Sequence, residues 1–217
     1  MVDELVSPFL SSTNPTMGVY AKRDGIHLRL TSKSSDREQA ESLINKREND
    51  IRAILKDSVW GTDSNTLETI IAELLAKKRL TLATMECETG GLLAQTITSV
   101  PGSSAYYKGG LIACTDEAKT GMGIDASLIS RYTSASIEMA EAMATKAREQ
   151  FDADIGIGLT VAVEPTNIKD IPVGSTFLSI VDGTTKHRSL RHAPGQQHQL
   201  KQRAVISTLF ELRKILL

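Results

Sequence analysis

The sequence predicts an α/β protein, with a three-layer α/β/α sandwich built on a mixed sheet and a small β-β-α layer in front of it. Three observations predict this fold. Apolar, β-branched runs typical of buried strands alternate with segments of helical periodicity. The longest such run, 155–163, is almost wholly apolar, as expected for a central strand covered on both faces. A length of 217 residues is enough for one ordinary domain and a small appendage.

Residues 1–62 are predicted to form the small layer, which is too short to bury a large core alone. Residues 11–15 are rich in Ser, Thr, Asn and Pro and indicate a loop. Arg23-Asp24-Gly25 separates two strand-like runs, 18–22 and 26–31, and so predicts a hairpin. Apolar and polar residues alternate in the second run, and its buried face is expected to carry Ile26, Leu28 and Leu30.

A helix is predicted to follow the hairpin. Ser35 and Glu38 form a capping-box pattern at its start. A short strand at 58–60 would complete the layer. The helix has an apolar stripe that consists of Ala40, Leu43, Ile44, Ile51, Ile54 and Leu55.

Residues 63–217 carry the predicted sandwich, which opens with a helix that starts near Asn65. A buried strand follows over 80–85, and a second is predicted over 111–114. Between them, a Gly pair at 90–91 and a Pro-Gly turn at 101–104 enclose a short helix.

The remaining elements follow from the same patterns. Ser136 opens the longest of the helices that are rich in Ala and Met, and the central strand over 155–163 comes next. Strands over 176–181 and 186–190 make a hairpin. An amphipathic helix over 199–216 closes the chain.

Composition excludes several classes of protein. The chain has 25 Lys and Arg against 26 Asp and Glu, so there is no electrostatic case for binding nucleic acid or an anionic membrane. Only 4% of the residues are aromatic, which supplies few base-stacking side chains. No apolar run of about 20 residues and no basic leader are present, and Cys87 and Cys114 do not form a disulfide pattern. We therefore expect a cytoplasmic protein.

Most of the histidines lie in one basic stretch, 186–203. Their spacings match no zinc pattern, and carboxylates and thiols are lacking nearby. We interpret the stretch as a solvated basic edge and expect neither a metal nor a cofactor. The histidines in it are His187, His192 and His198.

Two loops could carry chemistry. At Thr89-Gly90-Gly91 a strand ends in a Gly pair that starts a helix, so unpaired N–H groups could hold a phosphate or carboxylate. The alternative is a tight turn without a ligand. Ser104 follows a Pro-Gly turn and could be a nucleophile beside a suitable base, or an ordinary turn residue.

Two further residues stand out near predicted strands. Lys119 comes just after a buried strand, and it is either an activating ammonium or a solvated helix residue. Thr160 interrupts an apolar run, so its hydroxyl needs a partner. That partner could belong to the sheet edge or to the floor of a pocket at a strand end.

Several segments together resemble the CinA family. The C-terminal part is similar to the family's nicotinamide-nucleotide amidohydrolase domain, and the front, with Asn14-Pro15-Thr16 and 27–31, resembles its KH-type middle region. The family's larger N-terminal molybdopterin-binding-like domain has no counterpart in this sequence. The segments that carry the resemblance are LATMECETGG at 82–91, PGSSAY at 101–106, Gly109-Gly110, Glu117-Ala118-Lys119, 160–165 and Pro172-Val173-Gly174.

The resemblance implies hydrolysis of nicotinamide mononucleotide to nicotinate mononucleotide and ammonia, without a metal, by a cytoplasmic homodimer. It implies that Ser104 is the nucleophile and that Lys119 and Thr160 act beside it in one cleft. Thr89, Gly90 and Gly91 would bind the nucleotide. Cys114 stands where the family has a tyrosine thought to transfer protons.

This sequence departs from the family at positions that would face a ligand. Cys87 replaces a serine and Glu88 a cysteine, and a carboxylate at 88 would repel a phosphate. Val161 and Glu164 replace glycines and narrow the approach to the backbone; Glu88 and Glu164 could even plug the cleft. Two hypotheses stay open: a hydrolase of pyridine nucleotides, and a non-catalytic CinA-like binding or assembly module. A nucleic-acid-binding KH module fits least, because no GXXG loop is visible.

Overall fold

The computed structural model of the chain describes residues 2–165 and 171–217. The chain divides into two compact units, Met1–Ser64 and Asn65–Leu217. Each unit has its own hydrophobic core.

The small unit is built on the predicted hairpin. Strands β1 (Thr16–Lys22) and β2 (Gly25–Thr31) pair antiparallel, and Lys22 lies opposite Gly25 across the turn. Helix α2 (Arg37–Leu55) follows, as predicted, and ends in the 3₁₀ turn η1 (Lys56–Ser58). An additional helix, α1 (Val2–Leu10), precedes the hairpin. The core of this unit consists of Val6, Met17, Ile51 and Leu55, with partly buried neighbours that include Leu28 and Leu30.

Four local predictions for the small unit are wrong, and one of them is Ile54 of the predicted apolar stripe, which is 41% exposed. Ile26 is 44% exposed, although strict alternation placed it with Leu28 and Leu30. Asp36 caps α2 in place of Ser35, because its carboxylate accepts from the backbone N–H groups of Glu38 and Gln39. The predicted strand at 58–60 is not formed.

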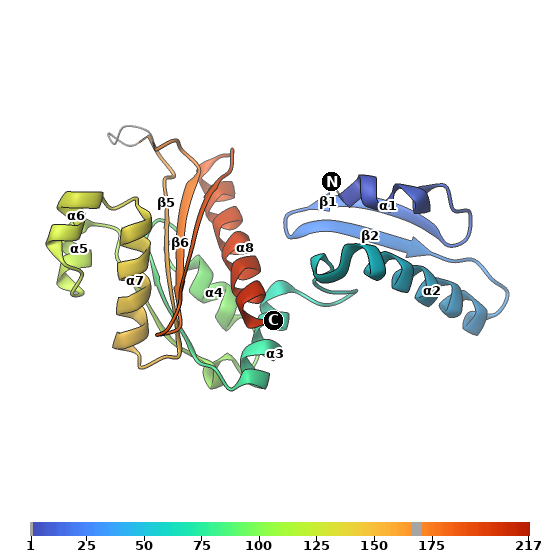
Figure 1. Cartoon of the computed structure of the whole chain (residues 1–217), viewed down its shortest axis with the longest axis horizontal. Helices are drawn as coiled ribbons and strands as arrows, with labels where there is room; N and C mark the ends of the chain where they lie inside the picture. Colours follow the sequence, from blue (N-terminus) through green and yellow to red (C-terminus); the bar gives the residue numbers. More distant parts are fainter. Residues whose placement is uncertain (1, 166–170) are drawn as a thin grey trace. The chain divides into compact units, whose positions relative to one another are not determined.

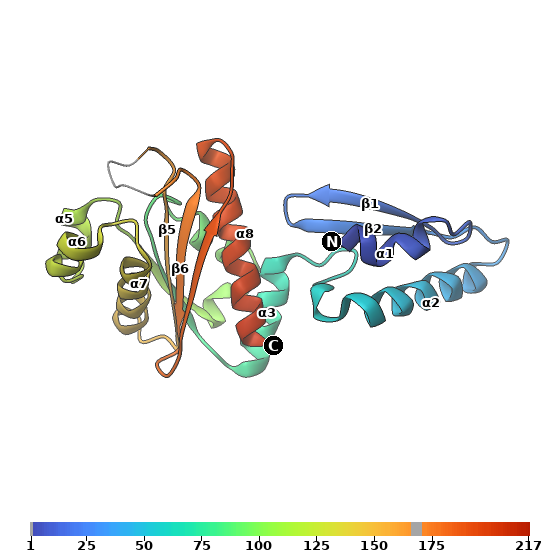
Figure 2. The same ribbon diagram turned by 45° about the horizontal axis from the view of Figure 1, so that its top comes forward.

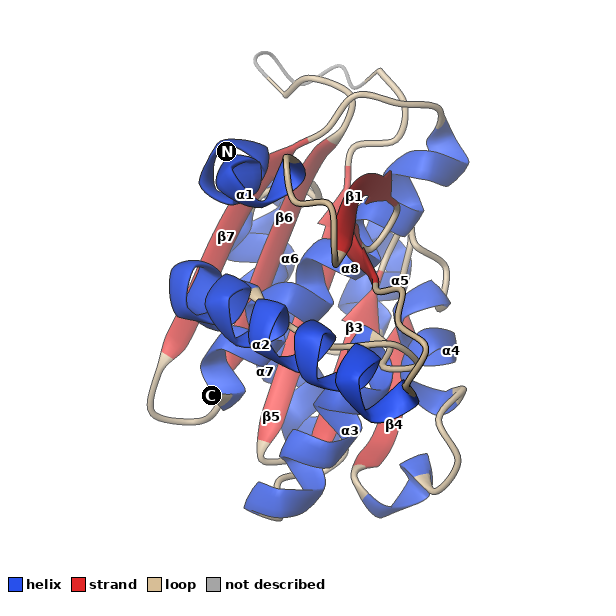
Figure 3. Cartoon of the chain, turned by 90° about the vertical axis from the view of Figure 1, so that its right-hand side faces the viewer, coloured by secondary structure: helices blue, strands red, loops and turns tan. Residues whose placement is uncertain are grey.

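The large unit contains a five-stranded mixed sheet with the strand order β4-β3-β5-β6-β7, which Figure 3 shows from right to left. Strand β3 runs parallel to β4 and β5, whereas β6 is antiparallel to β5 and β7. The expected central strand and C-terminal hairpin are confirmed. The strands are β3 (Leu82–Glu86), β4 (Tyr107–Ile112), β5 (Ile155–Val161), β6 (Ser175–Val181) and β7 (Lys186–His192).

Helices cover both faces of this sheet, so the three-layer α/β/α architecture is confirmed (Figures 1 and 2). Helices α4 and α8 lie on one face, with α3 packed on α8, and α7 lies on the other. Short helices α5 and α6 follow β4 and lead into α7. The helices are α3 (Leu67–Lys78), α4 (Leu92–Thr98), α5 (Asp116–Gly121), α6 (Ala126–Tyr132), α7 (Ile137–Gln150) and α8 (Gln197–Leu216).

Helix α7 touches β5 backbone to backbone. A Cβ atom added at Gly158 would lie 1.9 Å from the carbonyl oxygen of Ala140, far inside van der Waals contact. Gly156 is equally close to Ala144, at 2.0 Å. The two glycines therefore let the helix approach the central strand more closely than any side chain would allow.

A reciprocal clamp ties the starts of β3 and β5. The side chain and the backbone N–H of Thr81 both donate to Asp154 Oδ2 at 2.7 Å, and the backbone N–H of Asp154 donates to Thr81 Oγ1 at 2.9 Å. The clamp fixes the register at the amino end of the parallel strands.

Part of the basic stretch is structural. Glu211 of α8 is buried and accepts from His187 (3.1 Å) and Arg191 (2.8 Å) of β7 and from Lys214 (3.0 Å). Burial alone would raise the pKa of Glu211, but hydrogen bonds from Lys214 and Arg191 outweigh it and lower the pKa. These contacts fasten the edge strand to the C-terminal helix.

None of the helices in the described parts of the chain has the length and apolar character needed to cross a membrane.

Candidate functional site

Buried polar groups gather at the carboxyl ends of β3 and β5. Glu86, Cys87 and Thr160 lie there, and Lys119 reaches the same place from α5; all four are almost completely buried. In α/β sheets, ligands bind beyond the carboxyl ends of the parallel strands, where loops of different strands converge. This end of the sheet is therefore the candidate site.

Glu86 occupies the helix start that was expected to bind an anion. Its carboxylate accepts from Thr89 Oγ1 at 2.6 Å and from the backbone N–H groups of Leu93 (3.0 Å) and Ala94 (2.8 Å) of α4. The protein's own carboxylate thus satisfies the N–H groups that a phosphate would use. A role for Thr89, Gly90 and Gly91 in nucleotide binding stays a prediction, and these contacts do not support it.

Lys119 is 0% exposed, so it is not the solvated helix residue of the alternative interpretation. Its Nζ donates to Ser134 Oγ at 3.3 Å and lies 3.6 Å from Cys87 Sγ. Within the described part of the chain, no carboxylate forms an ion pair with this ammonium. A buried cation with neutral partners is costly, and such groups mark functional sites more often than structural ones.

Glu88 joins the ends of β3 and β5. Its Oε1 accepts from Cys87 Sγ at 2.9 Å, and its Oε2 accepts from the backbone N–H of Val161 at 2.9 Å and lies 3.0 Å from Thr160 Oγ1. Burial, and then the charge of Glu88, raise the pKa of the Cys87 thiol well above its usual range. The thiol is therefore protonated at neutral pH.

Thr160 finds its partners within this cluster. Besides Glu88, its hydroxyl reaches the backbone carbonyl oxygen of Ser134 at 3.4 Å. The interruption of the apolar run thus places a hydroxyl beside the candidate site.

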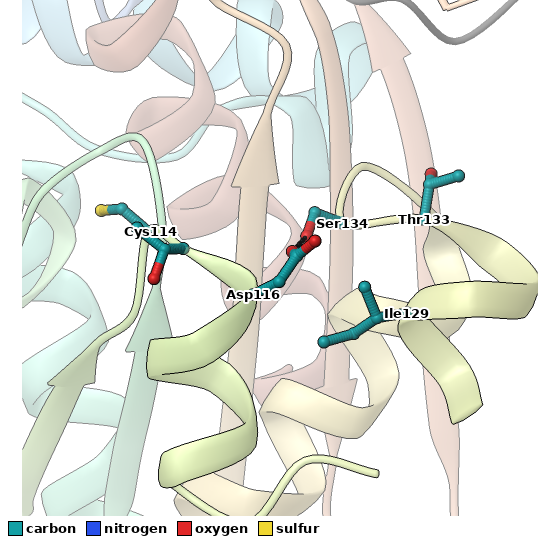
Figure 4. A pocket seen from close by; sticks show the side chains of 6 residues that line it. Cys114, Asp116, Ile129, Thr133 and Ser134 are labelled. Carbon is teal, nitrogen blue, oxygen red and sulfur yellow. Dashed lines mark hydrogen bonds between the residues drawn. The ribbon is translucent and has the colours of Figure 1, made fainter. Parts of the chain in front are cut away.

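An open surface pocket of about 460 Å³ lies next to the cluster. Figure 4 shows Asp116 and Ser134 pointing toward each other in its wall, and Ser134 Oγ donates a short hydrogen bond to Asp116 Oδ1. The thiol of Cys114 points away from these two groups and donates to the Cys87 carbonyl oxygen at 3.1 Å. The pocket is lined by Cys114, Thr115, Asp116, Ile129, Thr133 and Ser134.

Thr133 adopts a strained backbone conformation in the pocket wall. Its φ is +71°, a left-handed value that is rare for a β-branched residue. Its buried hydroxyl has no hydrogen-bond partner among the described residues. Strain and an unpaired polar group in one pocket are typical of functional sites.

Ser104 lies elsewhere. It is exposed in the 3₁₀ turn η2 (Ser103–Ala105), just before β4, whereas Lys119 follows the other end of that strand. A six-residue strand spans about 20 Å. Within this chain, therefore, Lys119 and Thr160 come together but Ser104 does not join them.

Glu164 does not plug the site, because its side chain is exposed and accepts from Gln197 Nε2 at 3.5 Å. Sequence reasoning missed Asp116 and Ser134, which are 18 residues apart and meet only through the fold. No spacing rule could have paired them.

Two family descriptions match this chain. Residues 64–216 match the CinA C-terminal domain, and residues 1–61 match the Damage-inducible protein CinA KH domain. A competence-damage inducible protein of Moorella thermoacetica is 37% identical over 213 residues, which cover 97% of this chain and 51% of that protein. For its counterpart in Clostridium kluyveri the identity is 36%, with coverages of 99% and 53%. The chain thus spans about half the length of these relatives.

Solved structures agree with this assignment. A competence-damaged protein (CinA) superfamily protein from Escherichia coli superposes with a TM-score of 0.67 at 27% identity, over 72% of this chain and 94% of that one. A competence or damage-inducible protein from Enterobacter asburiae gives 0.66 at 25% identity, over 71% and 100%. The matches cover both units, so the chain belongs to the CinA family.

Proposed function

We propose that the C-terminal unit hydrolyses the carboxamide of a pyridine nucleotide, converting nicotinamide mononucleotide to nicotinate mononucleotide and ammonia. The observation that carries the proposal is the buried Lys119 ammonium, which lacks an ion-pair partner among the described residues and contacts a hydroxyl and a thiol beside a pocket. Attack on a carboxamide places negative charge on its oxygen. A fixed cation in a water-poor site stabilises that charge more than the neutral ground state.

The pocket lining supports a cationic aromatic amide as the substrate. It offers the carboxylate of Asp116, the hydroxyls of Thr115 and Ser134, and the apolar side chain of Ile129. A pyridinium ring is positively charged and flat, so it suits a carboxylate beside an aliphatic wall. Among the described residues that line the pocket there is no lysine or arginine, so the phosphate is expected to lie outside it.

Ammonia release from nicotinamide mononucleotide tests the proposal. The wild-type chain should release ammonia, and Lys119→Met should lower kcat by about 100-fold or more, since one charge-stabilising group is worth that much. Nicotinamide riboside, which lacks the phosphate, serves as a second substrate. Ser104→Ala is the matched control, because Ser104 lies at the other end of β4.

The non-catalytic alternative gives a different result. Calorimetry would then detect binding of the nucleotide, while neither substrate yields ammonia and Lys119→Met changes only the affinity. That outcome would refute the amidohydrolase proposal.

A further inference from the structure

We propose that Ser134 is the nucleophile of this site, that Asp116 accepts its proton, and that Lys119 holds its oxygen. The substrate assigned to this reaction rests on the proposed function above, whereas the reactivity of Ser134 can be tested without that substrate.

The hydroxyl of Ser134 lies between a cation and a proton acceptor. Lys119 Nζ donates to Ser134 Oγ at 3.3 Å, and Ser134 Oγ donates to Asp116 Oδ1. An adjacent base activates a serine hydroxyl for attack, and an adjacent ammonium stabilises the oxygen as it loses its proton. Both groups are in hydrogen-bonding contact with the same atom, which geometry requires of a nucleophile and its base.

Access separates Ser134 from the other candidate nucleophiles. Ser134 lines the pocket, so its oxygen adjoins space that a substrate can occupy. Cys87 also contacts Lys119, but it is 0% exposed, and its protonated thiol is engaged with Glu88. Ser104 is exposed but lies at the opposite end of β4. Of the three, only Ser134 touches both the pocket and Lys119 within the described residues.

The backbone around Ser134 is held in place from two sides. Thr133, immediately before it, has the left-handed φ of +71°, and the Thr160 hydroxyl oxygen lies 3.4 Å from the Ser134 carbonyl oxygen. A nucleophile on a strained, fixed turn needs little reorganisation before attack. Thr160 thus packs against the turn that carries Ser134.

The first half of the reaction forms an ester. Ser134 Oγ bonds to the carboxamide carbon while its proton passes to Asp116, and the carbonyl electron pair moves to the oxygen. When the tetrahedral intermediate collapses, the C–N bond breaks and the nitrogen takes the proton from Asp116. Ammonia leaves, and the acyl group stays on Ser134.

The second half returns the enzyme to its starting state. Water adds to the ester carbon and gives a proton to Asp116, and the C–Oγ bond breaks as Ser134 regains that proton. The sum is amide plus water giving acid plus ammonia, so no oxidant, reductant or further reactant is needed.

A fluorophosphonate, which phosphorylates activated serine hydroxyls, tests the assignment directly. Mass spectrometry of the labelled chain should place the adduct on Ser134. Asp116→Asn and Lys119→Met should each slow labelling by about tenfold or more, because each loses one activating contact. The adduct should be absent from Ser134→Ala, whose urea unfolding midpoint should stay near that of the wild type.

A second variant keeps the test independent of the probe. In Ser134→Cys, iodoacetamide should alkylate residue 134 faster than the native Cys87, and Lys119→Met in the same background should slow that alkylation. Ammonia release by Ser134→Ala should fall by about 10³-fold.

The outcomes distinguish this inference from the proposed function. An adduct on Ser134 without ammonia release contradicts the proposed substrate and supports the nucleophile. Ammonia release that survives in Ser134→Ala overturns the nucleophile and leaves the proposed function standing. An unlabelled Ser134, or alkylation of Cys87 that abolishes turnover, overturns this inference as well.

Discussion

The two ends of the five-stranded sheet differ in how their polar groups are satisfied. At the amino end, Thr81 and Asp154 satisfy each other through short hydrogen bonds near the solvent. At the carboxyl end, Lys119 is buried and has only neutral partners among the described residues. A saturated pair contributes stability, whereas a buried charge that no carboxylate contacts directly costs stability and is found more often at functional sites. The difference makes the carboxyl end the candidate for the proposed chemistry and the amino end the one that holds the strands.

The largest expected effect concerns the close contact between helix α7 and strand β5, which runs between the two ends of the sheet. Gly158→Ala would drive a methyl group into the Ala140 carbonyl and separate α7 from β5. We expect the free energy of unfolding of the large unit to fall by about 3 kcal/mol or more in urea titrations. Gly121→Ala is the matched control, because nothing lies within 4 Å of its added Cβ. Equal stability of the two variants would contradict the close helix–strand contact.

Glu86→Ala tests whether the carboxyl end also contains a purely structural group. The change leaves Thr89 and two N–H groups of α4 without their acceptor. The free energy of unfolding should fall by about 2–3 kcal/mol. Glu86→Gln, which keeps one acceptor oxygen, should lose less. Increased phosphate binding by Glu86→Ala would show that the expected anion site exists once its own carboxylate is removed.

Asp154→Ala weakens the amino end and should cost about 1 kcal/mol at pH 7. Hydrogen bonds from the side chain and the backbone of Thr81 lower the pKa of Asp154 in the folded state. A lowered folded pKa gives stability that is present above the unfolded pKa of about 3.9 and is lost as the pH falls through the folded value. The gap between wild type and variant in urea titrations should therefore shrink below about pH 4. A gap that stays constant down to pH 2 would rule out this linkage.

The smallest effect is expected for Ser104→Ala at the amino end. Its side chain is exposed, so the free energy of unfolding should change by less than about 0.5 kcal/mol. Ammonia release should stay within about twofold of the wild-type rate. A tenfold lower rate of ammonia release would show that the amino end of the sheet contributes to the reaction. It would contradict the assignment of the chemistry to the carboxyl end.

Much of the fold could be predicted because burial leaves a local pattern. The apolar run at 155–163 and the turn at Gly183 marked the central strand and the hairpin correctly. Strand β4 begins four residues before its predicted start, because Gly109 and Gly110 within it carry no strand signal. Helix α1 was missed, since its packing against the small unit's core decides it.

The site could be predicted only in part. Lys119 and Thr160 stood out because each polar side chain sat against an apolar run. Ser104 was predicted from a sequence motif. Such a motif does not show at which end of a strand its residues lie. Tertiary contacts place the Glu86 carboxylate at the N-terminus of α4 and bring Asp116 to Ser134. Such contacts have no signature in a single sequence.

The buried ammonium of Lys119, which no carboxylate among the described residues contacts directly, also affects turnover in the proposed reaction. In the proposed reaction a neutral amide becomes a carboxylate next to Ser134, and this new negative charge is attracted to the Lys119 ammonium, which no carboxylate among the described residues contacts directly. The acid formed would be held more tightly than the amide consumed. Product release would then be the rate-limiting step, and the accumulated acid product would inhibit the reaction.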